Sequence, residues 1–301
     1  MNAQELSLAR TAWAAGPVEA RALVRASGED ARAYVNRMST QKLDALAPGE
    51  TAFAALLDAK GHLLADLQVL GREDGLLLEL DPAAAATAIP HLEKFVIADD
   101  VTFEDLSAAL RVIPVLGPEA AAHLDGVPGD RLESRRRGVA AVDLVVPAGE
   151  AEVVRAALVA KGAASLDADA LELLRVEGGR SRWGAELDGS RLPMEAGLTK
   201  EAISFFKGCY VGQEVVMRAT ARGRLQKGLV LLGLPPGAAP GAKLQAGGQE
   251  VGWITSAVDG PDGRVGLGYL RRAHWTVGER VAVTSGGEAE VRKVVVEEPE
   301  L

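Results

Sequence analysis

The sequence has few of the residues on which several protein classes depend. It holds one cysteine, so no disulfide can form within the chain, and we expect a reducing compartment, the cytoplasm. The four histidines are scattered without metal-ligand spacing, and a lone cysteine cannot hold an iron–sulfur cluster by itself, so we predict no metal site. Aromatic residues make up only 4%, so the cores must consist mainly of Ala, Leu and Val.

Long apolar runs are also missing. No run is long enough to span a bilayer, and the polar residues at the start of the sequence predict no secretory signal. There is no phosphate-binding P-loop and no dinucleotide-binding glycine pattern after a strand. The net charge of −9 argues against broad nucleic-acid binding. We therefore expect a globular monomer of roughly two or three domains that does not contact membranes.

The first part of the chain reads as an α+β unit, because several predicted strands are followed by a helix that can pack back on them. A short helix is expected within 4–15. The other predicted elements are a strand at 23–26, a helix at 27–37 with Ser27 as its cap, strands at 51–57, 63–70 and 76–80, a helix at 81–95 and a strand at 101–106.

The second part predicts another α+β unit and then an all-β region. Its expected elements are strands at 110–116 and 140–147, helices at 119–124 and 150–161, and a helix start at Asp167 or Asp169 followed by a strand that runs into Glu177. From Leu225 the predicted strands lie at 229–234, 250–256, 263–269, 280–284 and 291–296. This region predicts a small barrel or sandwich. We divide the chain into an α+β domain at 1–47 and 111–224, an inserted α+β domain at 48–110, and a C-terminal barrel at 225–301.

The lone cysteine lies in the stretch KGCYVGQE, residues 207–214. The glycines on both sides of Cys209 allow a tight loop that exposes the sulfur. Lys207 would favour the reactive thiolate, whereas Glu214 would oppose it if its carboxylate points at the sulfur. The alternative is that Cys209 is a small core residue, but the polar residues around it disfavour a core segment.

A basic segment follows this stretch. Residues 218–227 contain four positive charges and no acid. We predict that Arg218, Arg222 and Arg224 attract an anionic ligand beside the cysteine. The alternative is an ordinary solvated basic surface.

The stretch KGCYVGQE resembles the K-G-C-[YF]-x-G-Q-E signature of the YgfZ family of folate-binding proteins, which are related to the aminomethyltransferase (T-protein) of the glycine cleavage system. The resemblance implies a T-protein-like α+β cloverleaf, with two ferredoxin-like units and a C-terminal β-barrel. It also implies tetrahydrofolate or a one-carbon derivative as cofactor, and iron–sulfur proteins as clients, including some that modify tRNA.

Two further segments, 175–187 and 193–198, resemble the R-x-E-x-G…G-x-E-L and P-x-E-A-G-L elements of the same superfamily. The resemblance implies that Glu177 binds the pterin ring, and we place Glu195 in the same folate site. A carboxylate can accept two neighbouring N–H groups of a pterin as a pair. The alternative is that Glu177 pairs with Arg175 or Arg180 on the surface.

Asp66 resembles an aspartate of T-protein that faces folate and is tied to catalysis, which would place it on the wall of a central cavity. The alternative is an outward strand residue. T-protein carries two adjacent acids here, but this chain has Ala65 before Asp66, and this weakens the case for aminomethyl transfer.

The function that these residues and the resemblance together favour is a tetrahydrofolate-binding protein that supports the assembly or repair of iron–sulfur enzymes. Cys209 would carry the chemistry, with Lys207 and Asp66 as further catalytic candidates. The alternatives are a true aminomethyltransferase and a non-catalytic, folate-dependent scaffold for iron–sulfur clients. Whether the protein is an enzyme, such as a folate-dependent one-carbon or sulfur-related transferase, stays open.

Overall fold

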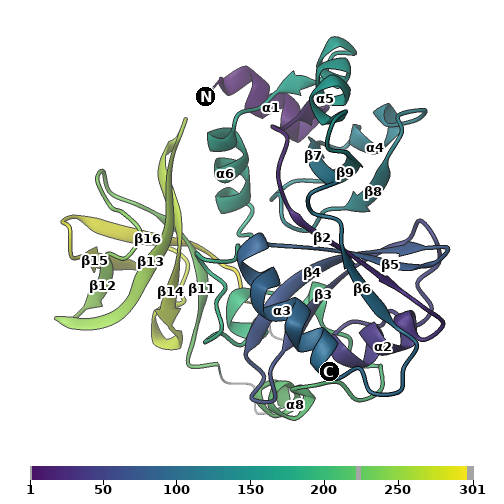
Figure 1. The fold of residues 1–301 in the computed structure, drawn as a ribbon. Coiled ribbons are helices and arrows are strands. Elements are labelled where there is room, and N and C mark those ends of the chain that lie inside the picture. Colours follow the sequence, from purple (N-terminus) through teal and green to yellow (C-terminus); the bar gives the residue numbers. More distant parts are fainter. Residues whose placement is uncertain (1, 222–224, 297–301) are drawn as a thin grey trace.

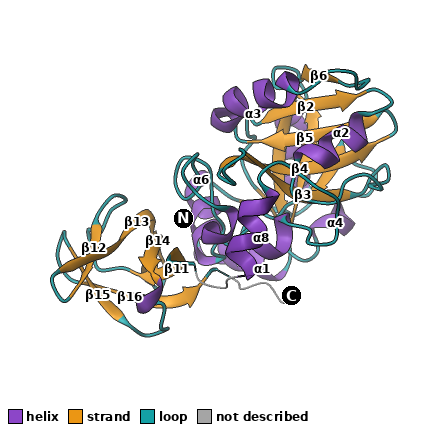
Figure 2. Cartoon of the chain, turned by 90° about the horizontal axis from the view of Figure 1, so that it is seen from below, coloured by secondary structure: helices purple, strands orange, loops and turns teal. Residues whose placement is uncertain are grey.

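The computed structural model describes residues 2–221 and 225–296 of the chain. It contains two five-stranded sheets and one closed barrel, which are arranged around a common centre (Figure 1). Figure 2 shows the barrel to one side of the two sheets. None of the described helices is long and apolar enough to cross a membrane.

The first sheet has the strand order β10-β1-β7-β9-β8. In that order, its strands are Ala164–Ser165, Ala14–Ala15, Leu110–Leu116, Ala141–Pro147 and Asp130–Glu133. The helices beside it are α1 (Ala3–Thr11), α4 (Ala120–His123) and α5 (Ala151–Ala160). The last two cover one face, where Ala120 and Leu158 share a core with Ile113 of β7.

The second sheet is antiparallel throughout, with the order β3-β4-β5-β2-β6. In that order, its strands are Thr51–Leu57, Leu63–Arg72, Gly75–Leu80, Ala22–Ser27 and Thr102–Asp105. Because β2 lies inside this sheet, the boundary that we predicted between 47 and 48 does not coincide with the division between the sheets.

Two helices, α2 (Ala31–Met38) and α3 (Pro82–Lys94), cover one face of the second sheet. Asp81 caps α3, since its side chain accepts a hydrogen bond from the backbone N–H of Ala83. The cap predicted for α2 is wrong, because Ser27 is the last residue of β2 and the helix begins after Asp30.

The two sheets meet through a mixed apolar and polar interface. Leu23 and Leu77 of the second sheet share a core with Val112 and Val145 of the first. Beside this core, Gln68 is 1% exposed and donates hydrogen bonds to carboxylates on both sheets. Carboxylates buried in this way are stable only when they are paired, so this interface fixes the sheets in one arrangement.

The barrel predicted for the C-terminal region is confirmed, with the closed order β11-β14-β13-β12-β15-β16. In that order, its strands are Lys227–Gly233, Gly263–Arg271, Gln249–Gly260, Lys243–Ala246, Arg280–Val283 and Glu288–Val294. The short turn η2 (Arg272–His274) follows β14. Strand β12 was not predicted from the sequence, because it is short and follows a proline- and glycine-rich loop.

The strand predicted to run into Glu177 is wrong, because helix α6 (Ala168–Glu177) continues through that residue. Asp167 caps the helix by accepting from the backbone of Ala170. Leu173 and Leu174 of α6 share a core with the barrel, so the helix joins the barrel to the sheets. The segment beyond α6 forms η1 (Pro193–Ala196), α7 (Thr199–Ala202) and α8 (Gln213–Ala221).

Candidate functional site

The cysteine stretch forms a loop between α7 and α8, and Cys209 is exposed on it. Gly212 has a φ of +83° and lies so close to the β3–β4 hairpin that a Cβ there would come within 2.7 Å of the Asp58 carbonyl oxygen. Only glycine fits such a position without strain. Tyr210 is buried in the core beneath the loop. The loop is therefore anchored on both sides of an accessible sulfur, and the core-residue alternative for Cys209 is wrong.

Lys207 anchors the other end of the loop. Its ammonium group donates to three backbone carbonyls, that of Asn36 in the last turn of α2 and those of Ser39 and Gln41 just after the helix. Burial lowers the pKa of Lys207 to about 8, while Asp44 opposes this shift. These contacts assign Lys207 a positioning role, and its effect on the Cys209 thiol stays a prediction.

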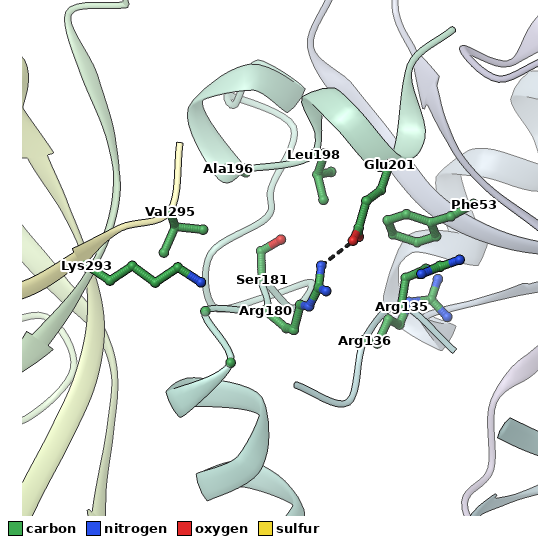
Figure 3. Close-up of a pocket in the computed structure, with 13 residues that line it drawn as sticks. Phe53, Arg135, Arg136, Arg180, Ser181, Ala196, Leu198, Glu201, Lys293 and Val295 are labelled. Atoms are coloured by element: carbon green, nitrogen blue, oxygen red, sulfur yellow. Dashed lines mark hydrogen bonds and ion pairs between the residues drawn. The ribbon is translucent and has the colours of Figure 1, made fainter. Parts of the chain in front are cut away.

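A cavity of about 110 Å³ lies where the sheets, the segment after α6 and the barrel meet (Figure 3). Its wall includes two glycine segments that follow Glu177 and Glu195, residues 178–181 and 196–198. A Cβ at Gly197, which has a φ of +76°, would lie 2.7 Å from a methyl carbon of Val295. The barrel strand thus packs directly against the glycine wall, and both superfamily-like elements border the cavity.

The side chains around the cavity are strongly basic. Arg135, Arg136, Arg180 and Lys293 line it, against a single carboxylate, that of Glu201. None of these four cations was among the site residues predicted from the sequence. The one signal available was the run of three arginines at 135–137, which is unusual in a chain of net charge −9. The geometry favours a ligand that carries negative charge.

Two more open clefts adjoin this cavity, with volumes of about 440 Å³ and 450 Å³. Arg135 lines the cavity and both clefts. Arg180 and Glu201, joined by an ion pair of 2.6 Å, each line the cavity and one cleft. A ligand held in the cavity can therefore extend outward past Arg135.

Asp66 lies behind the cavity wall. It is 2% exposed on β4, so the outward-facing alternative is wrong. Its carboxylate accepts a hydrogen bond from Arg136 Nε at 2.7 Å, and Arg136 also pairs with Glu79. Arg136 therefore lines the cavity, and the carboxylates of Asp66 and Glu79 bind its guanidinium group on the side away from the cavity.

Glu177 occupies the last position of α6, just before Gly178 on the cavity wall. Its carboxylate pairs with Arg10 of α1 and is about a third exposed. The partners proposed in the alternative, Arg175 and Arg180, are wrong, because they pair with other carboxylates.

The remaining predicted residues lie apart from the cavity wall. Glu195 is buried beside Lys227 at 3.7 Å, and burial raises the pKa of its carboxyl group against the opposing effect of that lysine. Arg218 is exposed on α8 and lies 3.5 Å from Glu214. Arg222 and Arg224 lie outside the described residues. Cys209 is not among the residues that line the 110 Å³ cavity.

Metal ligands do not gather at this site or elsewhere in the described ranges, 2–221 and 225–296. No three His, Cys, Asp or Glu side chains of those ranges lie together in a way that could hold a metal ion.

Comparison with known proteins places these features in a family. Residues 2–136 match the model of the GCVT N-terminal domain. The chain is 30% identical to the human iron-sulfur cluster assembly factor IBA57, mitochondrial, covering 87% of this chain and 78% of that protein. It is 28% identical to the tRNA-modifying protein YgfZ of Serratia proteamaculans, covering 80% and 79% of the two chains. Across the curated relatives compared, the chain spans 66% to 79% of their lengths.

The fold has a clear structural counterpart. The crystal structure of the glycine cleavage system aminomethyltransferase T from Bartonella henselae superposes with a TM-score of 0.83 at 22% identity, covering 98% of this chain and 89% of that chain. This likeness confirms the predicted T-protein-like fold. The chain belongs to the YgfZ-like branch, with IBA57, of the aminomethyltransferase superfamily.

Proposed function

We propose that the protein binds a reduced folate in the cavity between its sheets and barrel, and that it supports iron–sulfur enzymes, including tRNA-modifying ones, through Cys209. The observation that carries the proposal is the exposed lone sulfur on a loop anchored by Lys207, Tyr210 and Gly212. The relatives' names supply the client class, because one is called an iron–sulfur cluster assembly factor and another a tRNA-modifying protein.

The residues around the cavity fit a folate. The cavity volume of about 110 Å³ corresponds to roughly three or four water molecules, which is too small for a whole folate. The adjoining clefts leave room for the rest of the molecule. Beside the wall, the hydroxyl of Thr199 is buried and has no partner among the described residues. The Glu177 carboxylate pairs with Arg10 and does not line the cavity, so it would have to leave Arg10 and turn past Gly178 to accept the neighbouring N–H groups of a pterin.

The aminomethyltransferase alternative has less support. Its chemistry would draw on an acid at the position of Asp66, but that carboxylate is buried and bonded to Arg136. Ala65 stands where T-protein has a second acid. We therefore propose a folate-binding role without aminomethyl transfer.

The scaffold alternative differs in one respect, since it does not require the sulfur. The test is Cys209→Ser in a cell that lacks its own protein of this family. We expect folded protein with unchanged folate affinity and loss of the activity of an iron–sulfur enzyme that depends on the family. The matched control is Ser204→Ala, which removes an oxygen from the same loop and leaves the sulfur. Full activity of the Cys209→Ser variant would support the scaffold instead. The cytoplasmic location stays a prediction.

A further inference from the structure

Phe206 projects from the cysteine loop into solvent. With 95% of its surface exposed, it is the most exposed large apolar side chain among the described residues. Its neighbour Phe205 packs against the core beneath the loop, and Cys209 follows three residues later. An aromatic ring that stays in water leaves the favourable free energy of its burial unused. The packing of the chain itself therefore gives Phe206 no role.

The backbone around Phe206 is fixed, so its exposure does not come from a loose loop. The N–H of Ser204 donates to the carbonyl of Thr40 at 2.9 Å, and the N–H of Phe206 donates to Ser204 Oγ at 3.4 Å. The next residue, Lys207, donates to three backbone carbonyls in and just after the last turn of α2. Less conformational freedom is lost when a partner covers a side chain on a backbone that is already held in place.

The exposed surface of this loop carries little charge. Within residues 203–213 the one Lys, Arg, Asp or Glu is Lys207, and its ammonium group is turned inward onto backbone carbonyls. The exposed residues of the loop are Phe206, Gly208 and Cys209. An RNA ligand requires cations for its phosphates. An uncharged surface around an aromatic side chain is typical of the centre of a contact with another protein.

We propose that Phe206 is the anchor by which an iron–sulfur client protein docks beside Cys209, and that the client presents an apolar pocket for the ring. This inference rests on the proposed function, because it names the contact that brings the client to the sulfur. A standard protein interface covers about 800 Å² on each partner, so a protein that contacts Cys209 also contacts Phe206. A second copy of this chain fits less well, since a two-fold dimer about Phe206 would cover both sulfurs.

The experiment varies the amount of the protein in a bacterial cell that lacks its own protein of this family. The readout is the modified nucleoside that an iron–sulfur tRNA-modifying enzyme makes in tRNA. Because Phe206→Ala weakens docking and keeps the sulfur, we expect it to require roughly tenfold more protein for the half-maximal readout and to reach the native plateau. Phe206→Leu keeps an apolar side chain and should require less than about threefold more. Cys209→Ser should lower the plateau at every expression level.

The matched control is Val153→Ala, which shortens an exposed apolar side chain on α5 of the first sheet and should behave as the native chain. A Phe206→Ala curve without a shift, or with a lowered plateau, would overturn the docking assignment and leave the role of Cys209 standing. If Cys209→Ser reaches the native plateau, or the native chain does not restore the readout, the proposed function itself fails.

Two binding measurements test the other occupants of this surface. Sedimentation compares the native chain with Phe206→Ala, and we expect both to be monomers. Filter binding with bulk tRNA should give the same weak affinity for both chains. A native dimer that Phe206→Ala abolishes, or a tRNA affinity that Phe206→Ala weakens, would overturn the assignment of Phe206 to a client protein.

Discussion

Glu79 offers the sharpest test of the interface between the two sheets. It lies on β5 and is 1% exposed. Its carboxylate accepts hydrogen bonds from Arg21, from Arg136 and, at 3.0 Å, from Gln68. Glu79→Gln keeps the size of the side chain but removes its charge, so two buried arginines lose a shared partner. Removing one partner of a buried ion pair costs about 3–5 kcal/mol.

The pKa of Glu79 gives an independent magnitude and a pH window. Burial favours the protonated form, but Arg136 and Arg21 outweigh it and lower the pKa from 4.5 to about 2. A tenfold change in the acid dissociation constant corresponds to about 1.4 kcal/mol, so the ionised carboxylate stabilises the fold by about 3 kcal/mol. Because the folded pKa is lowered, this contribution is fully present above pH 4.5 and is lost as the pH falls toward 2.

The assay is urea unfolding at pH 7 and at a series of lower pH values. We expect Glu79→Gln to lower the free energy of unfolding by about 3–5 kcal/mol at pH 7. The variant should also lose less stability than the native chain between pH 4.5 and 2. Glu104→Gln is the control, because Glu104 pairs with Arg25 and is about half exposed. Two results would refute the reasoning. One is equal stability of the two variants at pH 7, and the other is a Glu79→Gln variant that loses as much stability as the native chain between pH 4.5 and 2.

Two further predictions concern the candidate site. Glu177→Gln should weaken reduced-folate binding about tenfold or more, since a charge-assisted pair contributes roughly 1.5–3 kcal/mol; unchanged affinity in calorimetry would remove Glu177 from the site. Lys207→Met should lower the free energy of unfolding by about 1–3 kcal/mol, because three carbonyls at the end of α2 lose their donor. A variant as stable as the native chain would mean that other contacts hold the cysteine loop.

Local sequence patterns predicted most of the fold. Asp81 and Pro82 fit the start of α3, and short apolar runs between turn residues marked β3, β4 and β5, because these signals act within a few residues. The error at Glu177 has the same origin. The apolar residues before it also fit a strand, and their contacts with the barrel lie far away in the sequence. Strand pairing is likewise non-local, so the place of β2 inside the second sheet could not be inferred.

The candidate site was predicted only in part for a related reason. The resemblance located the glycine segments of the wall through Glu177 and Glu195, because those motifs are contiguous in sequence. It could not identify Lys293, since that residue meets the cavity only when the barrel closes beside α6. The role of Asp66 depends in the same way on Arg136, 70 residues later in the chain.

The cysteine loop and the cavity are separate features, but one short segment connects them. The segment begins at the cavity wall, passes Glu201 and ends at Lys207. Gln41 contacts it twice, because its side chain donates to the Glu201 carbonyl at 3.0 Å and its own carbonyl accepts from Lys207 at 2.8 Å. Gln41 therefore joins a residue that lines the cavity to the residue that anchors the cysteine loop. Contact alone does not establish energetic coupling, so the two features are connected in structure through this one residue.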